Sequence, residues 1–516
     1  MTRDLAVRFV RWLLGCFFRR VEVAGLEHLP PPERGGVLVS WHPNGLIDPA
    51  LILTHVPRRV VFGARHGLFR WPVLGLLMRA LGTVPIYRAQ DQEGEPSEAR
   101  RGIVPPGARS ARSERSARES EGDEARRARN RESLDALARV VADGSYSTLF
   151  PEGVSHDAPH LQALKVGAAR LYYRACQLRP PGAPLPAIVP VGLHYGEKQT
   201  FRSDALVELH PPLELPERLA ELPPETSEED YRARCAELTA ELERALVASV
   251  RPTESWELHH LMQRARALLR AERARRAGAE LAAPGPGERA LGFARVWEGY
   301  QRRREDAPEA TAALLRRVRE YHEDLIGLGL EDDELDRSPR QARPLYSLLL
   351  ALQVLGVYLL LPPLLVLGAA VNGLPYLAIR WISWLSARQQ KDLATIKWLL
   401  GVLLFPAAWA GAGALVWLGW LDLARAFPGR IPHTPTAAAL STLLLAAAGG
   451  LFALRYGELT SRTLRALRVR LTRARYRAAV ARLLTERAAL HDALTGMATG
   501  LALPGEVTNS GRVLPG

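Results

Sequence analysis

The sequence predicts an α/β domain built on a mixed sheet flanked by helices, followed by a helical region and then by a C-terminal group of membrane helices. Three observations lead to this division. Short apolar runs that end in turns alternate with helical stretches over residues 21–216. Residues 217–343 are charged, rich in Leu and Ala, and helical in period. Residues 344–455 contain long apolar runs of the kind that membrane helices need.

Two short apolar runs of the α/β domain lead directly into turns that carry ionisable side chains. Gly-Val-Leu-Val-Ser (36–40) precedes Trp-His-Pro-Asn-Gly-Leu-Ile-Asp-Pro (41–49). Tyr-Ser-Thr-Leu-Phe (146–150) precedes Pro-Glu-Gly-Val-Ser (151–155). Both runs are typical of buried strands, and α/β proteins place reactive groups at strand ends. These two turns are therefore the candidate site.

The remaining elements of the α/β domain follow from the same patterns. We expect a helix from about Ser133 to Ala142, before the second turn, and another over 161–176, after it. Strands over 186–193 and 205–209 complete the domain, which ends near residue 216.

Two segments near the N-terminal end interrupt or precede this alternation. Residues 1–20 contain an apolar, aromatic run with interspersed Arg that is too short to span a bilayer. It is predicted either as an interfacial membrane helix or as a core helix of the following domain. Residues 91–131 are Arg, Glu, Ser and Gly with few large apolar side chains, which predicts a disordered surface insertion.

The apolar C-terminal runs indicate an integral membrane protein. Residues 398–421 and 436–454 are charge-free and about 20 residues long, enough to cross a bilayer. A Pro-Pro pair interrupts the preceding apolar region, so residues 345–385 are expected to enter and return as a re-entrant pair. The basic tail 456–516 and the Arg and Lys residues between the apolar regions then belong on the cytoplasmic side, together with the α/β domain. A bacterial inner membrane fits this arrangement.

Composition narrows the class of partner. The formal net charge is +13 and the pI is about 10.0, which suits a phosphate-bearing partner such as nucleic acid, anionic lipid or coenzyme A. The basic residues do not form aromatic-interleaved stripes of the nucleic-acid type, and the apolar runs favour the membrane. The three cysteines have no metal-binding spacing, and no Walker or dinucleotide fingerprint is present, so we expect no metal or cofactor.

The first turn suits proton abstraction from a hydroxyl group. Histidine as a residue type can accept and release a proton near neutral pH, and a carboxylate such as Asp48 can fix the tautomer of the His42 imidazole and stabilise its cation. For a His and an Asp taken alone, a surface histidine beside a helix-capping aspartate is the simpler interpretation. Three further motifs reverse that preference.

Four ordered segments together resemble the motifs of the glycerolipid acyltransferases, a family that includes the glycerol-3-phosphate and lysophosphatidate acyltransferases. Residues 41–49 resemble the His-Asp motif, and 81–88 (Leu-Gly-Thr-Val-Pro-Ile-Tyr-Arg) resemble a Gly-led strand that ends in Arg. Residues 150–153 resemble the Phe-Pro-Glu-Gly motif, and 188–193 (Ile-Val-Pro-Val-Gly-Leu) resemble the Pro-interrupted strand. The joint match is specific although each motif alone is weak.

One departure concerns the spacing of the first motif. Five residues separate His42 from Asp48, whereas the common family pattern has four. A subgroup similar to the fungal glycerol-3-phosphate and dihydroxyacetone-phosphate acyltransferases carries the longer turn. Residues 192–203 and 391–398 also resemble that subgroup.

The resemblance implies a role for each matching residue. His42 is the implied general base and Asp48 its partner, while Glu152 and Gly153 help position the acceptor. Arg88, at the end of the second motif, is the expected main phosphate ligand because a guanidinium matches phosphate oxygens bidentately, and Arg202 is a second candidate. Pro190 is expected to shape the acyl pocket. Lys165, on the predicted helix after the third motif, is a candidate contact for a coenzyme A phosphate, and a solvated helix face is the alternative.

The resulting hypothesis is a membrane-bound O-acyltransferase that moves a fatty acyl group from acyl-CoA or acyl carrier protein to glycerol 3-phosphate or dihydroxyacetone phosphate in phospholipid synthesis. Anionic membrane lipids are the expected surface partner, and nucleic acid is not expected. Lysophosphatidate acylation is the alternative within the class. A non-catalytic, lipid-binding membrane scaffold is the alternative from another class.

Overall fold

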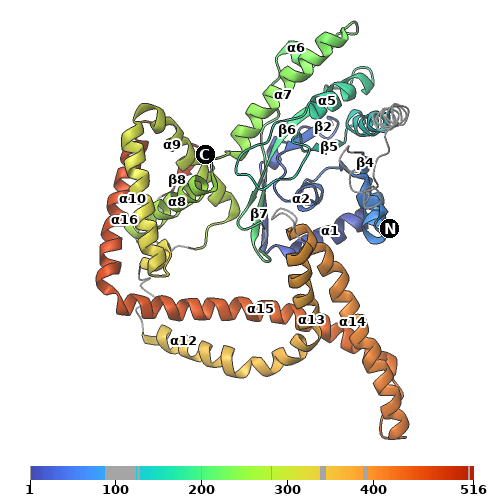
Figure 1. Ribbon diagram of the computed structural model, residues 1–516, viewed down its shortest axis with the longest axis vertical. Helices are drawn as coiled ribbons and strands as arrows, with labels where there is room; N and C mark the ends of the chain where they lie inside the picture. The colour runs from blue at the N-terminus through green and yellow to red at the C-terminus, as the bar shows by residue number, and fades with distance from the viewer. Residues whose placement is uncertain are drawn as a thin grey trace, which may run out of the picture. The chain divides into compact units, whose positions relative to one another are not determined.

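A computed structural model describes residues 2–87, 124, 128–198, 200–279, 282–336, 344–386, 393–508 and 512–515. The chain divides into two compact units, residues 1–252 and 253–516, each described by itself below (Figure 1). Most of the expected insertion at 91–131 lies outside the described residues.

The first unit is built on a seven-stranded sheet in the order β1-β7-β6-β2-β5-β3-β4. Neighbouring strands pair in parallel except β6 and β7, which are antiparallel. This confirms the predicted mixed sheet. The strands are β1 (Arg20–Ala24), β2 (Gly36–Ser40), β3 (Val60–Arg65), β4 (Val84–Ile86), β5 (Tyr146–Leu149), β6 (Ala187–Tyr195) and β7 (Asp204–Leu209).

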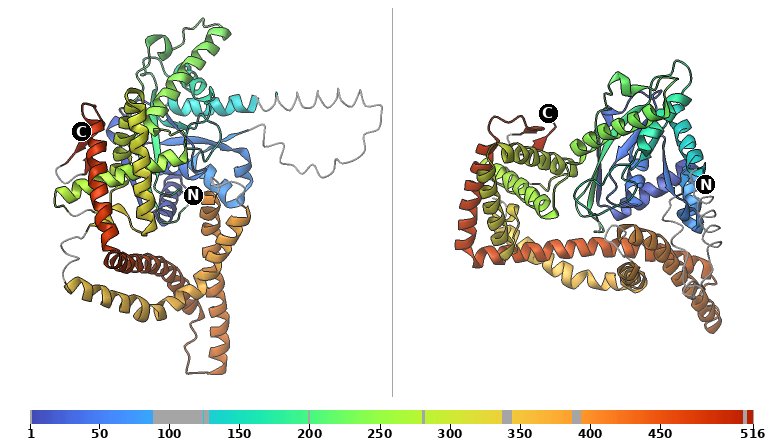
Figure 2. Two further views of the ribbon diagram at one scale, coloured as in Figure 1. Left: turned by 60° about the vertical axis from the view of Figure 1, so that its left-hand side comes forward. Right: turned by 45° about the horizontal axis from the view of Figure 1, so that its top comes forward.

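Helices cover both faces of this sheet, as Figures 1 and 2 show. A helix over residues 128–142 packs with α5 and α7 on the face to which Val37 and Val39 of β2 point. Leu38, between them, points to the opposite face because strand side chains alternate. There α2 contacts β3 and β7, and α1 packs on α2 and α3. The helices are α1 (Arg3–Phe17), α2 (Ile47–His55), α3 (Pro72–Leu81), α5 (Gly167–Leu178), α6 (Glu217–Ala220) and α7 (Glu228–Val250), with short turns η1 (Leu26–His28) and η2 (His66–Arg70).

Helix α7 extends the first unit beyond the expected end near residue 216. Its Cys235, Leu238, Leu242 and Leu246 are buried against α5 and the sheet. These positions recur at helical spacing, so they form a single apolar stripe. Because the opposite face of α7 is charged, its sequence pattern placed it in the helical region expected over residues 217–343.

Helix α1 packs in the core of the first unit on one side and is exposed on the other. Val10, Leu14 and Phe17 are buried inside the first unit. The other face exposes Leu5 and Trp12, with 56% and 59% of their surface accessible. The helix therefore belongs to the core of its unit and also presents an apolar, aromatic face.

The second unit is helical. It comprises α8 (Trp256–Arg276), α9 (Pro286–Asp306), α10 (Pro308–Gly327), α11 (Asp332–Leu335), α12 (Pro344–Leu355), the π-helix η5 (Gly356–Leu360), α13 (Pro362–Ser386), α14 (Leu393–Ala426), α15 (Pro435–Arg475), α16 (Arg477–Ala498) and a two-stranded sheet of β8 (Glu506–Val507) and β9 (Val513–Leu514).

The basic C-terminal segment is part of this unit and not a separate tail. Helix α16 packs on α8 and α10, and its Arg487 is fully buried. Arg487 donates to Glu272 Oε2 at 3.2 Å and to Asp336 Oδ2 at 2.6 Å. Burial opposes ionisation of Glu272, but Arg275, Arg276 and Arg487 hold its pKa at about 2. A buried charge that is paired in this way ties α16 to α8 and to the segment after α11.

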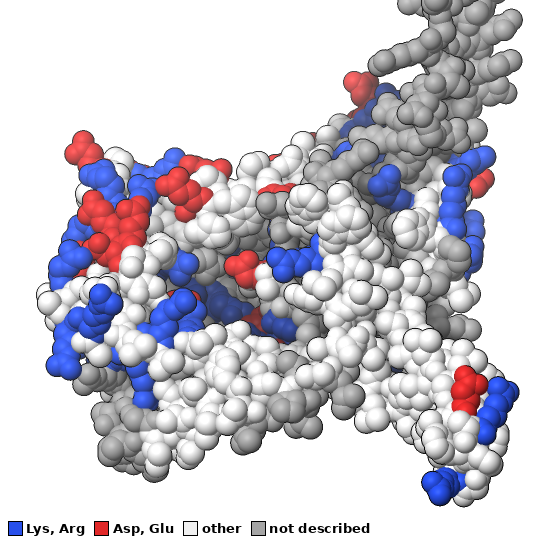
Figure 3. Space-filling view, turned by 60° about the horizontal axis from the view of Figure 1, so that its bottom comes forward, with Lys and Arg blue, Asp and Glu red and all other residues white. Residues whose placement is uncertain are grey.

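Among the described residues, the stretches 396–426 and 435–475 are helical, long and apolar enough to cross a membrane. They form a hairpin, α14 and α15, against which α13 packs. Figure 3 shows charged side chains at the end of a projecting arm whose flank is largely uncharged. Asp422, Arg425 and Arg430 are the exposed charges at the turn of this hairpin.

The region expected to be a re-entrant pair has a different form. Helix α12 continues through η5 into α13, and Leu361 before Pro362 keeps helical backbone angles (φ −80°, ψ −30°). The path bends there without folding back on itself (Figure 1). Proline is tolerated in the first turn of a helix because that N–H lacks an intrahelical partner. The Pro pair therefore starts α13 and does not turn the chain round.

Close packing of α13 on α15 depends on facing glycines. A Cβ added at Gly368 would lie 2.7 Å from the carbonyl oxygen of Gly449, and backbone atoms cannot move aside. We expect Gly368→Ile to destabilise the second unit by about 1–3 kcal/mol through overpacking, measured as a lower Tm of the detergent-solubilised protein. Gly373→Ile, on the same helix with open space at its Cβ position, is the matched control and should leave the Tm nearly unchanged. Equal Tm values for the two variants would contradict this account of the packing.

Candidate active site

The candidate site lies where three neighbouring strands of the first unit end. Strand β2 pairs in parallel with β5 on one side and with β6 on the other. The turns after β2 and β5 therefore emerge at the same edge of the sheet. The backbone N–H of His156 donates to the carbonyl of His42 at 3.0 Å, which joins the two turns directly.

His42 and Asp48 form a hydrogen-bonded pair. Nδ1 of His42 lies 2.8 Å from Oδ2 of Asp48, whose side chain is fully buried. The imidazole is 14% exposed and stacks on the ring of Phe150 with centroids 4.2 Å apart. An Asp acceptor at Nδ1 places the proton of the neutral ring there, which leaves Nε2 as the nitrogen that can accept a proton.

The five-residue spacing between these two residues is accommodated by a glycine. Gly45 has φ +52°, a conformation that side-chain-bearing residues rarely adopt. After this turn, Asp48 lies in the first turn of α2, where its Oδ2 also accepts from the N–H of Asn44 at 2.7 Å. The longer turn therefore still brings the carboxylate to the imidazole.

Tyr195 completes the surroundings of Asp48 and was missed as a site residue by sequence reasoning. Its hydroxyl donates to Oδ1 of Asp48 from the last residue of β6. Burial and the adjacent carboxylate raise the pKa of Tyr195 well above its ordinary value. Tyr195 therefore stays a neutral hydroxyl that donates to Asp48. The sequence signal that could have found Tyr195 is the pair of polar ring side chains, His194 and Tyr195, at the end of a predicted strand.

Glu152 is buried and fully engaged by protein donors. Oε2 accepts from the backbone N–H of His42 at 2.9 Å. Oε1 accepts from the N–H of Gln162 at 2.9 Å and lies 2.6 Å from Nε2 of His156. The carboxylate thus binds the His42 turn to the loop after β5, while its expected part in positioning the acceptor stays a prediction.

Lys165 lies in a loop, two residues before α5 begins at Gly167, so the helix expected over 161–176 starts later. The reason is local: the N–H groups of Gln162 and Lys165 are used by Glu152 and by the carbonyl of Pro151. Gly153 has φ +71°, and a Cβ there would lie 2.8 Å from the Lys165 ammonium. Lys165 is exposed beside the loop that follows the third motif.

The other expected substrate ligands are placed as follows. Arg88 lies outside the described residues. Pro190 is buried in β6 next to Val39 of β2. Arg202 has φ +65° and donates its backbone N–H to the carbonyl of Phe17, at the end of α1.

One further cation at this edge was not anticipated. The carbonyl of Lys198 accepts from Nδ2 of Asn44 at 3.2 Å, and its ammonium pairs with Asp157. The residues of the described part of the chain contain no group of three or more His, Cys, Asp or Glu that could hold a metal ion.

The geometry can be compared with known proteins. Residues 20–194 match the family model described as Acyltransferase. This part of the chain is an acyltransferase domain. The matched residues include β1 through β5, β6 as far as His194, and both turns of the candidate site.

Two curated relatives match at modest identity. An uncharacterized acyltransferase of Schizosaccharomyces pombe is 23% identical over 275 residues, 42% of this chain and 40% of that protein. Glycerol-3-phosphate O-acyltransferase 1 of Saccharomyces cerevisiae is 25% identical over 276 residues, 42% of this chain and 36% of that protein. The match thus spans about two fifths of either relative. The crystal structure of the 1-acyl-sn-glycerophosphate acyltransferase PlsC from Thermotoga maritima aligns with a TM-score of 0.29 and 18% identity over 47% of this chain and 78% of that one.

Proposed function

We propose that the chain is a glycerolipid O-acyltransferase that transfers a fatty acyl group from acyl-CoA or acyl carrier protein to glycerol 3-phosphate. The observation that carries the proposal is the His42–Asp48 pair, with Nδ1 held by a buried carboxylate, in a domain that matches the acyltransferase family. The name of the Saccharomyces relative supports the acceptor.

The proposed reaction uses His42 twice. Nε2 accepts the proton of the acceptor hydroxyl as the hydroxyl oxygen attacks the thioester carbonyl carbon. The tetrahedral adduct then collapses, its C–S bond breaks, and the imidazolium returns the proton to the departing sulfur. The products are an ester and a thiol, so the reaction needs no redox step. Asp48 stabilises the imidazolium while it exists.

Around this dyad we assign supporting roles from charge and position. Glu152 acts as a positioning residue, because both of its oxygens accept from protein groups. Lys165 and Lys198 are the cations that flank the two turns, and we propose that they attract the phosphates of the acceptor or of coenzyme A. Arg88 and Arg202 keep their proposed role as phosphate ligands, with Gly153 allowing close approach of the backbone. Pro190 keeps its proposed role in shaping the acyl pocket.

Exposed apolar surface in each unit supports the proposed membrane association. In the first unit, α1 exposes Leu5 and Trp12. In the second, the hairpin of α14 and α15 is long and apolar enough to span a bilayer. We propose a bacterial inner-membrane location with the acyltransferase domain on the cytoplasmic face, because the Arg-rich end of α15 belongs there under the positive-inside rule.

The choice of acceptor is tested by rate measurements on the purified, detergent-solubilised chain. Glycerol 3-phosphate, dihydroxyacetone phosphate and lysophosphatidate are offered separately with one labelled acyl-CoA. We expect kcat/KM for glycerol 3-phosphate to exceed that for lysophosphatidate by at least about tenfold, the discrimination that about 1.4 kcal/mol of differential transition-state binding gives. A preference for lysophosphatidate would replace the proposed acceptor and leave the acyl-transfer chemistry in place.

A further inference from the structure

A second site candidate lies in the helical part of the second unit, among α8, α9, α10, α16 and the C-terminal residues. It is a cavity of about 410 Å³. That volume falls in the lower part of the range of roughly 300–1,000 Å³ typical of small-molecule sites. Its lining combines many apolar side chains with five arginines: Arg266, Arg270, Arg273, Arg295 and Arg303.

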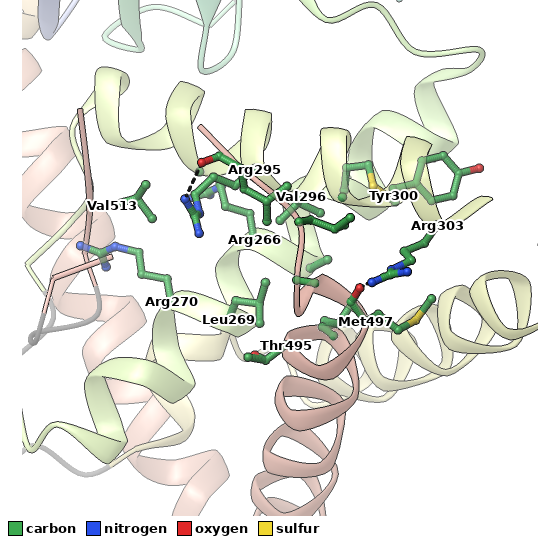
Figure 4. A pocket seen from close by; sticks show the side chains of 18 of the residues that line it. Arg266, Leu269, Arg270, Arg295, Val296, Tyr300, Arg303, Thr495, Met497 and Val513 are labelled. Carbon is green, nitrogen blue, oxygen red and sulfur yellow. Dashed lines mark hydrogen bonds between the residues drawn. The ribbon is translucent and has the colours of Figure 1, made fainter. Parts of the chain in front are cut away.

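The arginines and apolar groups are arranged by helix geometry. Arg266, Leu269, Arg270 and Arg273 of α8 occur at spacings of three, four and seven residues, so they share one face of the helix. Figure 4 shows Arg266, Arg270 and Arg295 gathered toward one side of the cavity. Apolar side chains such as Leu269 lie between them and Arg303, which is on the other side next to Met497. The cavity therefore has a cationic end and an apolar middle.

Protein groups satisfy only some of these arginines. Arg270 pairs with Glu288 at 2.8 Å, and Glu288 is the single carboxylate among the described lining residues. Arg303 donates to carbonyls at the end of α16, including that of Met497 at 2.5 Å. Arg295 donates to the carbonyls of the segment 503–505. Arg303 also pairs with Asp306 at 3.4 Å, a carboxylate outside the cavity lining. These contacts place the three guanidinium groups, but Glu288 is the single negative charge that the described lining itself supplies.

Arg266 and Arg273 have no carboxylate within ion-pair distance among the described residues. Nε of Arg266 donates to Oε1 of Gln263 at 3.0 Å, a neutral partner. Burial and the nearby Arg289 and Arg270 lower the pKa of Arg266 to about 10. Burial and Arg295 lower the pKa of Arg273. Partly buried cations that repel one another are costly to the folded protein unless an anion joins them.

We propose that this cavity binds a single-chain anionic lipid, either a fatty carboxylate or a monoacyl phosphate. The anionic head lies among Arg266, Arg273 and Arg295, because guanidinium groups match carboxylate and phosphate oxygens in charge and in geometry. The acyl chain enters the apolar middle beside Leu269 and Val296. The volume suits one chain better than two. The site is separate in sequence from the acyltransferase domain and goes beyond the proposed reaction.

The binding test uses the full-length chain carrying His42→Ala, so that turnover of the ligand does not interfere and the result is independent of the proposed catalysis. Labelled oleate and labelled oleoyl lysophosphatidate are titrated separately in neutral detergent. We expect a saturable component of about one ligand per chain that depends on the cavity residues, separate from any binding at the candidate active site of the first unit. The tighter ligand identifies whether the head is a carboxylate or a phosphate, and neutral monooleoylglycerol should compete at least tenfold less well.

Paired variants connect the binding to the cavity. Arg266→Gln with Arg273→Gln should weaken binding at least tenfold, whereas Arg302→Gln, an exposed arginine on α9, should leave it within about twofold. The Tm of the unliganded double variant should be equal or higher, because repelling charges are removed. Val296→Trp, which keeps the arginines and fills the apolar middle, should also abolish binding. The proposal is overturned if neither lipid binds saturably, if the neutral lipid competes equally, or if both the double variant and Val296→Trp bind like the parent.

Discussion

Replacing His42 by alanine is expected to lower kcat for acyl transfer by about 10²–10⁴-fold, the usual contribution of a positioned general acid–base. The imidazole is the group whose Nε2 is left to accept the hydroxyl proton, since Nδ1 is held by Asp48. The loss should appear in kcat and much less in the acceptor KM, because the imidazole accepts the proton during the reaction and is not needed to bind the acceptor. Steady-state rates with labelled acyl-CoA and glycerol 3-phosphate measure both parameters.

A matched histidine separates a catalytic loss from a general one. His160 lies in the segment after β5 and is exposed. His160→Ala should retain wild-type rates, and both variants should keep a Tm close to that of the parent because His42 loses only one side-chain hydrogen bond. A His42→Ala chain that is folded and transfers acyl groups at the parental rate would remove His42 from the mechanism.

Glu152→Gln is the second substitution with a large expected effect. Each oxygen of Glu152 accepts from protein donors, and a glutamine amide offers one oxygen and one NH2 group in their place. The NH2 group would face the N–H of His42 or of Gln162 and leave a buried donor unsatisfied. We expect a loss of about 1–3 kcal/mol in folding stability and a kcat that falls at least about tenfold as the His42 turn shifts. Differential scanning calorimetry of the purified protein measures the change in stability, and steady-state kinetics measure the change in kcat.

The kinetic pattern distinguishes a positioning role for Glu152 from direct contact with the acceptor. Loss of a positioning residue lowers kcat with little change in the acceptor KM, whereas loss of an acceptor ligand raises that KM. Glu197→Gln, an exposed carboxylate after β6, is the control and should change neither parameter. A selective rise in the acceptor KM at full stability would return Glu152 to the acceptor-binding role that its motif implies.

The predictable part of the fold is the part encoded by local patterns. Strands β2 and β5 are short apolar runs bounded by turn residues, and both appear at the positions that the pattern indicates. The helix over 128–142 begins a few residues earlier than expected, because helix propensity does not define the ends of a helix closely. Residue type and position along the chain were sufficient here because each element buries a face that its own sequence marks as apolar.

The parts that could not be predicted depend on contacts between distant segments. Tyr195 reaches Asp48 because β6 pairs with β2. The sequence of neither segment shows that these two strands are neighbours. Lys165 is kept out of a helix by hydrogen bonds to the turn after β5. Glu152 has the residue type of an acceptor ligand, and only its three donors show that the carboxylate is used within the protein.

The second unit shows the same limit on a larger scale. Helix α16 directly follows the Arg-rich end of α15, so the whole segment resembles a solvated tail in the sequence. Only the buried pairing of Arg487 with Glu272 shows that α16 packs in the unit. The arginine face of α8 is visible in the sequence as Arg266, Arg270 and Arg273. Its spacing indicates a shared face, but α9 and α16 are needed to make that face the wall of a cavity.

The most direct test of the central claim is transfer of a labelled acyl group from acyl-CoA to glycerol 3-phosphate by the purified wild-type chain, with the product identified by mass spectrometry. The account predicts a monoacylated glycerol phosphate that forms in proportion to the enzyme and is absent with His42→Ala. If the folded, membrane-inserted chain forms no acylated product from glycerol 3-phosphate, dihydroxyacetone phosphate or lysophosphatidate with either donor, the claim of catalysis is wrong, and the non-catalytic lipid-binding scaffold takes its place.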